Sequence, residues 1–230
     1  AMRQPQALHD TLEDWLLRHW LEPPDGPSLA ELLHEAGTAL ETASAAALDR
    51  LGRAAILTIL RRGLFGVEGI NHRLAERLRR RLDPGTGRSL LFAGAPVLVT
   101  RNTPGLGLFN GDLGLTVRRA DGRLTVLFRR GGEVIQVPVP LLPPHELAFA
   151  LTVHKSQGSE YGNVLLVVPP MPGHRLLTRE IVYTAVTRSR GMVAIWSSPG
   201  ILAEALERRV QRSGALGLWD AEQMATGVEA

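Results

Sequence analysis

The residues best suited to chemistry form a short polar run, HKSQGSE, at positions 154–160, directly after the apolar letters ALTV. In an α/β protein, ligands gather at the carboxyl ends of the strands, where such a loop would stand. Gly158 lets the backbone approach a ligand closely, and backbone N–H groups could hold phosphate or ribose oxygens. The side chains of Thr152, Ser156 and Gln157 offer further hydrogen bonds of the same kind. The run therefore predicts a site for a phosphorylated ligand.

A second run, IVYTAVTRSR at residues 181–190, has helical character and ends in arginines. Arg188 is a candidate arginine finger, a fixed guanidinium that stabilises charge on a transferring γ-phosphoryl group. Glu160 in the first run could accept a hydrogen bond from a hydroxyl group. Each run also has a purely structural interpretation: a solvated loop with His154 and Lys155 exposed, and a helix with charged residues at its end. The two runs have to be interpreted together with the elements that position them.

Composition restricts the class of protein. The 230 residues, 44% of them hydrophobic, can bury a full core in one or two domains. Cysteine is absent, which excludes disulfides and thiolate metal sites and predicts a reducing cytoplasm. A formal net charge of +3 permits nucleic-acid binding without requiring it. The longest apolar runs, such as AAILTIL at residues 54–60, are too short to cross a bilayer, so no membrane partner is expected.

Strands and helices alternate on both sides of a β-rich middle section. Apolar residues recur at helical spacing over 8–21 and 28–51, and an aliphatic strand at 54–60 precedes a helix at 69–82 with a basic outer face. After the letters DPGTGR, short β-branched runs separated by Asp-Gly and Gly-Gly turns predict antiparallel hairpins. The α/β pattern then returns, with expected strands at 147–153, 164–170 and 192–198, a helix at 176–190 and a final helix at 201–212.

Taken together and in this order, the two polar runs resemble motifs V and VI of superfamily 1 DNA helicases, in particular the RecD family, the exodeoxyribonuclease V alpha subunit and its relatives. Residues 94–114, GAPVLVTRNTPGLGLFNGDLG, resemble the stretch with which that family opens a small barrel inserted in its second motor domain. Residues 63–78, GLFGVEGINHRLAERL, look like the family's Gly-Val-x-Gly-x-Asn segment. The resemblance extends over residues 54–212.

The resemblance implies a fold. It is an α/β protein with a RecA-like, P-loop NTPase-type parallel sheet and helices, interrupted by a small inserted antiparallel β-barrel. Residues 1–88 and 145–215 would form the second RecA-like domain, with a helical N-terminal part. Residues 89–144 would form the barrel, and residues 216–230 a C-terminal tail. The opening letters AM look like a cloning remnant, so we expect this chain to be a piece of a larger protein.

The resemblance also implies a nucleotide site. In this family, two RecA-like domains bind ATP between them, and closing and opening of the cleft moves single-stranded DNA. Arg188 would then be the finger on the γ-phosphate. Gln157, Gly158 and Glu160 would lie near the nucleotide, with Glu160 toward the ribose.

On the DNA side, the resemblance places four residues of the first run against the bound strand: Thr152, His154, Lys155 and Ser156. Asn71, Asn102 and Phe109 are further DNA-side candidates, and an aromatic ring such as that of Phe109 could stack on a base. These three also have structural interpretations. Asn71 could cap the helix that follows it, Asn102 could hold a turn, and Phe109 could belong to the barrel core.

One expected motif of an ATPase is missing from the chain. A P-loop requires G-x-x-x-x-G-K-[ST], and Lys155 is preceded by His154 instead of glycine. The resemblance therefore implies that ATP and Mg²⁺ belong to a parent protein and that this chain alone hydrolyses no ATP. The expected partners are single-stranded DNA, the missing N-terminal RecA-like domain and, as in relatives that work inside a helicase–nuclease complex, other subunits.

The sequence leaves room for three other functions. A non-catalytic nucleic-acid-binding module would hold DNA on the barrel and the basic helix 69–82. A protein-docking module would use the helices within residues 8–51. A dinucleotide-dependent oxidoreductase is disfavoured, because Gly105 and Gly107 are followed at the third required position by Asn110 and the segment precedes a strand.

Overall fold

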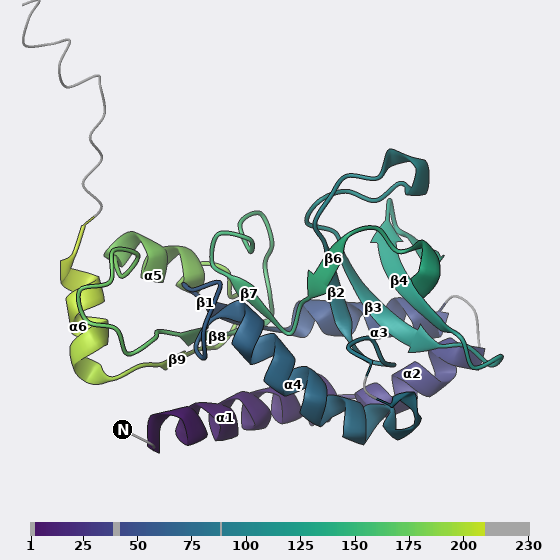
Figure 1. The fold of residues 1–230 in the computed structure, drawn as a ribbon, viewed down its shortest axis with the longest axis horizontal. Coiled ribbons are helices and arrows are strands. Elements are labelled where there is room, and N and C mark those ends of the chain that lie inside the picture. Colours follow the sequence, from purple (N-terminus) through teal and green to yellow (C-terminus); the bar gives the residue numbers. More distant parts are fainter. Residues whose placement is uncertain (1–2, 39–41, 88, 210–230) are drawn as a thin grey trace, which may run out of the picture.

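The computed structural model describes residues 3–38, 42–87 and 89–209. Two β-sheets lie side by side, with helices packed between and around them (Figure 1). The expected C-terminal tail at 216–230 lies outside the described residues. The helices are α1 (Arg3–Leu16), which continues as the π-helical turn η1 (Leu17–Leu21), α2 (Leu29–Thr38), α3 (Thr42–Arg53), α4 (Val67–Leu82), α5 (Arg179–Val186) and α6 (Pro199–Glu207).

The first sheet is parallel and has the strand order β7-β1-β8-β9. Its strands are β1 (Ala54–Thr58), β7 (Ala150–Thr152), β8 (Asn163–Val167) and β9 (Val193–Trp196). Alternate residues of β1 and β8 face opposite layers: Ile56 and Leu165 pack with α1 and α4, whereas Leu57 and Leu166 pack with α5 and α6. A sheet covered on both faces needs strands that are apolar throughout, which explains the unbroken aliphatic runs in the sequence. The predicted α/β fold with a parallel sheet is confirmed.

The second sheet is antiparallel, with the order β5-β4-β3-β2-β6. Among the described residues, no pairing joins the edge strands β5 and β6, so the structure has an open sheet where a closed barrel was expected. Its β6 pairs with β2 and lies just beyond residue 144, the predicted end of the insert. The strands are β2 (Pro96–Val99), β3 (Leu113–Arg118), β4 (Leu124–Arg130), β5 (Glu133–Pro138) and β6 (His145–Leu147).

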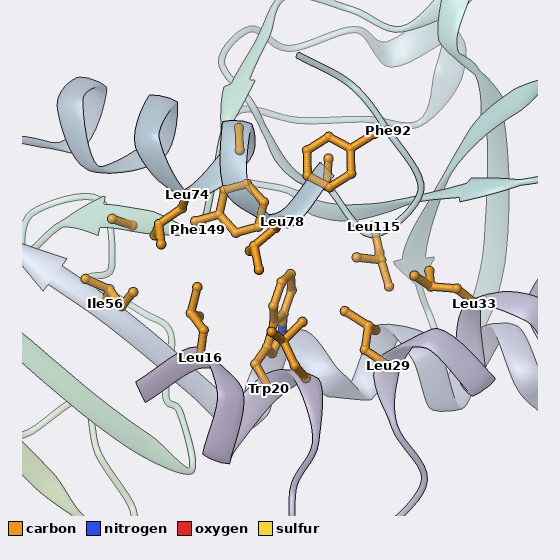
Figure 2. Close-up of a cluster of buried hydrophobic side chains, with 14 of the residues drawn as sticks. Leu16, Trp20, Leu29, Leu33, Ile56, Leu74, Leu78, Phe92, Leu115 and Phe149 are labelled. Carbon is orange, nitrogen blue, oxygen red and sulfur yellow. The ribbon is translucent and has the colours of Figure 1, made fainter. Parts of the chain in front are cut away.

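A single buried cluster connects the two sheets through the N-terminal helices (Figure 2). Trp20 meets Phe149 edge to face, with ring centroids 5.6 Å apart, and Phe149 stacks on Phe92 with centroids 6.2 Å apart. Ile56 of the parallel sheet and Leu115 of the antiparallel sheet belong to the same cluster. The helices before β1 therefore close a shared core, which is the usual role of amphipathic helices in a globular protein.

Candidate functional site

The two polar runs lie side by side, joined by backbone hydrogen bonds. The amide of Tyr161 donates to the carbonyl oxygen of Arg188 over 2.8 Å, and the amide of Arg190 donates to the carbonyl oxygen of Tyr161 over 2.9 Å. Because β8 begins at Asn163 and β9 at Val193, this pairing lies at the amino ends of two parallel strands. The sequence predicts the whole first run at the carboxyl end of a strand, whereas only its first half lies there.

Arg188 follows α5 directly and is held in place by carbonyl groups. Its Nε donates to the carbonyl oxygen of Thr184 over 3.2 Å, and its Nη1 to that of Ser159 over 3.4 Å. The helix itself is capped by Thr178, whose side chain accepts a hydrogen bond from the amide of Ile181. The half-buried guanidinium is therefore positioned by both polar runs at once.

Glu160 and Gly158 form the exposed rim of this pairing. The carboxylate of Glu160 accepts a hydrogen bond from Nε of Arg190 over 2.8 Å. Gly158 has a φ of +85°, and no atom lies within 4 Å of where its side chain would begin. A left-handed backbone beside open space suits glycine and lets a ligand approach the chain closely. Gln157 next to it is exposed.

Tyr161 anchors the loop from inside. Burial raises the pKa of its hydroxyl, more than the nearby Ser159 hydroxyl and Arg188 lower it, so the phenol is neutral at physiological pH. Its ring belongs to the core below α5 and α6. The rim residues are therefore mounted on a buried aromatic side chain.

The first half of the run lies at the carboxyl end of β7. The amide of Val153 still pairs with the carbonyl oxygen of Thr58 at the end of β1, over 3.0 Å. The hydroxyl of Thr152 accepts a hydrogen bond from the amide of Lys155 over 3.2 Å, and His154 and Lys155 are exposed. Ser156 is fully buried and donates its hydroxyl to the carbonyl oxygen of Val153 over 2.8 Å. The hydroxyl of Ser156 is used to fold the turn, and a DNA contact of this residue stays a prediction.

Asn71 has a structural position. It lies inside α4, only 4% exposed, so it neither caps that helix nor faces solvent. Its amide nitrogen donates to the carbonyl oxygens of Leu147 and Ala150 over 2.6 and 3.2 Å, and its oxygen accepts from the amide of Ala150 over 2.7 Å. Its side-chain amide is engaged in holding the start of β7, and a DNA contact of this residue stays a prediction.

Asn102 and Phe109 belong to the exposed loop between β2 and β3. The side-chain oxygen of Asn102 accepts a hydrogen bond from the amide of Asn110 over 2.8 Å, so the alternative that it holds a turn is confirmed. Phe109 is 38% exposed and does not belong to the core, contrary to the structural alternative. The guanidinium carbon of Arg130 lies 4.3 Å from the centroid of its ring. This cation–π pair leaves an aromatic surface beside a positive charge.

The basic helix α4 is partly occupied by its own contacts. Arg77 forms an ion pair with Glu13 of α1, and Arg81 forms one with Glu22. The guanidinium of Arg73 donates to the carbonyl oxygens of Leu64 and Gly69. Three of the arginines of α4 therefore make contacts with the rest of the chain.

Two functional candidates were missed by sequence reasoning, Arg190 and Glu146. Their partners are Glu160 and Lys155, which lie 30 and 9 residues away in the chain. Only the strand order brings these charges together, so local patterns could not identify them. Within the described ranges, no group of three or more His, Cys, Asp or Glu side chains could hold a metal ion, and no helix could span a membrane.

The parallel sheet and the paired polar runs define a helicase-type C-terminal domain, and residues 147–195 match the family profile described as "UvrD-like helicase C-terminal domain". The chain is 34% identical over 151 residues to the RecBCD enzyme subunit RecD of Buchnera aphidicola subsp. Schizaphis graminum, covering 64% of this chain and 25% of the relative. It is 36% identical over 173 residues to the same subunit of Mycolicibacterium smegmatis, covering 74% and 30%. These similarities show that the chain is a RecD-like superfamily 1 helicase C-terminal domain.

A third relative is the ATP-dependent RecD2 DNA helicase of Deinococcus radiodurans, 33% identical over 178 residues, with 72% of this chain and 23% of the relative covered. The chain thus spans less than a third of the length of these relatives. A solved structure of two Pif1 helicases on forked DNA aligns with 87% of this chain and 53% of its own, at a TM-score of 0.46 and 19% identity. That alignment is weak, and the fold rests on the sheet topology.

Proposed function

We propose that this chain is the second RecA-like motor domain of an ATP-dependent DNA helicase that acts in recombination and double-strand-break repair. The observation that carries the proposal is the pairing of residues 159–161 with residues 188–190. It places a fixed guanidinium, a carboxylate and a glycine beside open space at the amino ends of two parallel strands. The pairing continues the parallel ladder of β8 and β9 beyond the starts of both strands, so the sheet itself brings the two polar runs together.

The rim of the pairing fits a nucleotide bound from outside this chain. Arg188 would donate to γ-phosphate oxygens, and Glu160 would accept from a ribose hydroxyl. The open space at Gly158 lets the backbone come close, and Gln157 adds an exposed amide. ATP, with Mg²⁺ held elsewhere in the parent, would supply the free energy for movement. A fixed cation that meets charge formed in the transition state lowers the barrier without reorganisation.

The DNA side would lie at the other ends of the strands of the parallel sheet, their carboxyl ends. Thr152, His154 and Lys155 follow the carboxyl end of β7, whereas Glu160 precedes the amino end of β8. The connection between them, residues 153–162, runs from the carboxyl ends of the parallel strands to their amino ends. A shift of Glu160 on nucleotide binding could therefore reach His154 through a short continuous segment.

We expect this chain to bind single-stranded DNA weakly and in a salt-dependent manner, because phosphate contacts release counterions. The double substitution Thr152→Ala/His154→Ala should reduce that binding, since it removes the side chains that would face the strand. The measurement is fluorescence anisotropy of a labelled oligonucleotide over a salt series. Unchanged binding would move the DNA contacts to the antiparallel sheet and favour the non-catalytic binding module.

Phe109→Ala should weaken single-strand binding by about 1 kcal/mol, the lower end of the range for base–aromatic stacking. The exposed ring and the neighbouring guanidinium of Arg130 offer a stacking surface of the kind found in single-strand channels. The matched control is Leu141→Ala, which removes another exposed apolar side chain, 61% exposed, from the same β-rich segment. An equal loss for both variants would argue against a specific stacking role.

The partners follow from the same proposal. Single-stranded DNA and an N-terminal RecA-like domain would complete the motor, and the relatives named as subunits of the RecBCD enzyme suggest other subunits as well. The cytoplasmic location stays a prediction from the absence of cysteine.

A further inference from the structure

We infer that Glu146 is a positioning residue for the DNA-side loop: its carboxylate holds Lys155 in the absence of DNA and is displaced by a backbone phosphate when a strand binds. The inference rests on the proposed function, because it concerns the regulation of the same DNA-binding loop. It assigns a role to the only lysine in the chain and to an acidic residue that belongs to the other sheet.

The two side chains meet across the junction of the sheets. Nζ of Lys155 donates to Oε1 of Glu146 over 2.5 Å. Glu146 lies in β6, an edge strand of the antiparallel sheet, opposite Leu98 of β2. Lys155 lies in the turn after β7, an edge strand of the parallel sheet. The ion pair thus joins the loop that would face DNA to the edge strand of the other sheet.

The backbone under this ion pair is fixed. Asn71 binds the carbonyl oxygen of Leu147 and both backbone groups of Ala150, on either side of the point where the chain passes from β6 to β7. The amide of Ala148 also donates to the carbonyl oxygen of Pro96 in β2 over 2.9 Å. With the crossing segment held, the flexible part of the contact is the lysine side chain itself.

The chemistry of the pair allows exchange. The side chains of Lys155 and Glu146 are 36% and 25% exposed, so water and a phosphate can both reach the ammonium group. Partly exposed ion pairs are weak, and a lysine ammonium is a mobile point charge, whereas an arginine would bind a carboxylate in a planar fork. When the ammonium group moves to a phosphate, the carboxylate left behind repels the strand. Glu146 would therefore lower DNA affinity and set how readily the loop engages.

The test compares single-strand binding by the native chain and by Glu146→Gln, Lys155→Gln and the double variant. Anisotropy of a labelled oligothymidylate is followed over a salt series, and thermal unfolding checks that each variant is folded. We expect Glu146→Gln to tighten binding by up to about fivefold. Lys155→Gln should weaken binding and reduce the slope of log affinity against log salt by about 0.7, the loss of one phosphate contact on a single strand. In the Lys155→Gln background, Glu146→Gln should have a much smaller effect.

Glu133→Gln is the matched control, because it removes the same charge from β5, the opposite edge of the antiparallel sheet. Equal tightening by Glu133→Gln and Glu146→Gln would reduce the effect to net charge and overturn the inference. If Glu146→Gln bound DNA more weakly and Lys155→Gln left the slope of log affinity against log salt unchanged, the ion pair would be a permanent structural contact and the inference would be overturned. Both of these results leave the proposed DNA binding intact, whereas a native chain that binds no single strand would overturn both proposals.

Discussion

Under the proposed function, Arg188→Ala in a full-length helicase that contains this domain is expected to lower kcat for ATP hydrolysis by about a thousandfold or more, the range measured for arginine fingers. The guanidinium already stands at the rim of the paired runs, held through Nε and Nη1 by the carbonyl oxygens of Thr184 and Ser159. A preset cation stabilises charge that develops in the transition state, so its loss falls on kcat and much less on nucleotide affinity. Steady-state kinetics, with equilibrium binding of a fluorescent nucleotide analogue, separate the two effects.

Arg123→Ala is the control for that experiment. Its side chain is 87% exposed, next to Asp121 in the turn between β3 and β4, far in the chain from both polar runs. It should leave kcat unchanged. Arg188→Lys should recover only a small part of the loss, because an ammonium group lacks the planar fork. If this chain alone hydrolysed ATP and Arg188→Ala abolished that activity, the assignment of roles between the two motor domains would be wrong.

Motifs with a continuous local signal could be predicted from the sequence. The strands of the parallel sheet are aliphatic runs because both faces are covered. The helix expected at 176–190 exists as α5, but it begins after the cap Thr178 and ends at Val186, so its boundaries differ from the expected ones by three and four residues. The same local reasoning could not decide which polar side chains of a motif face outward. Thr152, His154 and Ser156 are all polar, yet only Ser156 is buried, because its hydroxyl donates a hydrogen bond inside the turn.

Long-range arrangement was beyond the sequence signal for a different reason. The expected site at the carboxyl end of a strand follows from a general rule for α/β proteins. Here the connection from β7 to β8 contains no helix, so one short loop runs from the carboxyl ends of the strands to their amino ends, where Glu160 meets Arg190. The antiparallel hairpins were likewise predictable from their turns, whereas closure into a barrel depends on pairing between the edge strands β5 and β6, which no local pattern encodes.

One continuous segment of the chain connects the junction of the two sheets with both ends of the parallel strands. Residues 145–163 pass from the antiparallel sheet through β7 and across to β8, and they carry Glu146, Lys155 and Glu160 in turn. The two ion pairs, Lys155 with Glu146 and Arg190 with Glu160, are accessible to solvent and therefore exchangeable. Asn71 and Tyr161 fix the backbone from below. A segment with a fixed backbone and exchangeable ion pairs is suited to transmit the effect of ligand binding from one end of the parallel strands to the other.

Asn71→Ala is expected to lower the free energy of unfolding by about 3 kcal/mol or more. The substitution removes three hydrogen bonds and leaves the buried amide and carbonyl groups at the start of β7 without their partner. Each net hydrogen bond contributes about 1 kcal/mol, and a buried group left unpaired costs about 1–3 kcal/mol. Urea unfolding followed by circular dichroism measures the change, provided that the slope with denaturant stays the same.

Asn102→Ala is the matched control for this prediction, because the same side chain is removed from an exposed loop where it makes one backbone hydrogen bond. Its cost should stay below about 1 kcal/mol. The two candidate roles of Asn71 predict opposite results in a pair of measurements. A structural clamp loses stability while the folded fraction keeps its affinity for single-stranded DNA. If Asn71 contacts DNA, the variant should lose affinity for single-stranded DNA while its stability stays unchanged. The buried position of the side-chain amide argues against this result, because DNA could reach it only if β7 left the sheet.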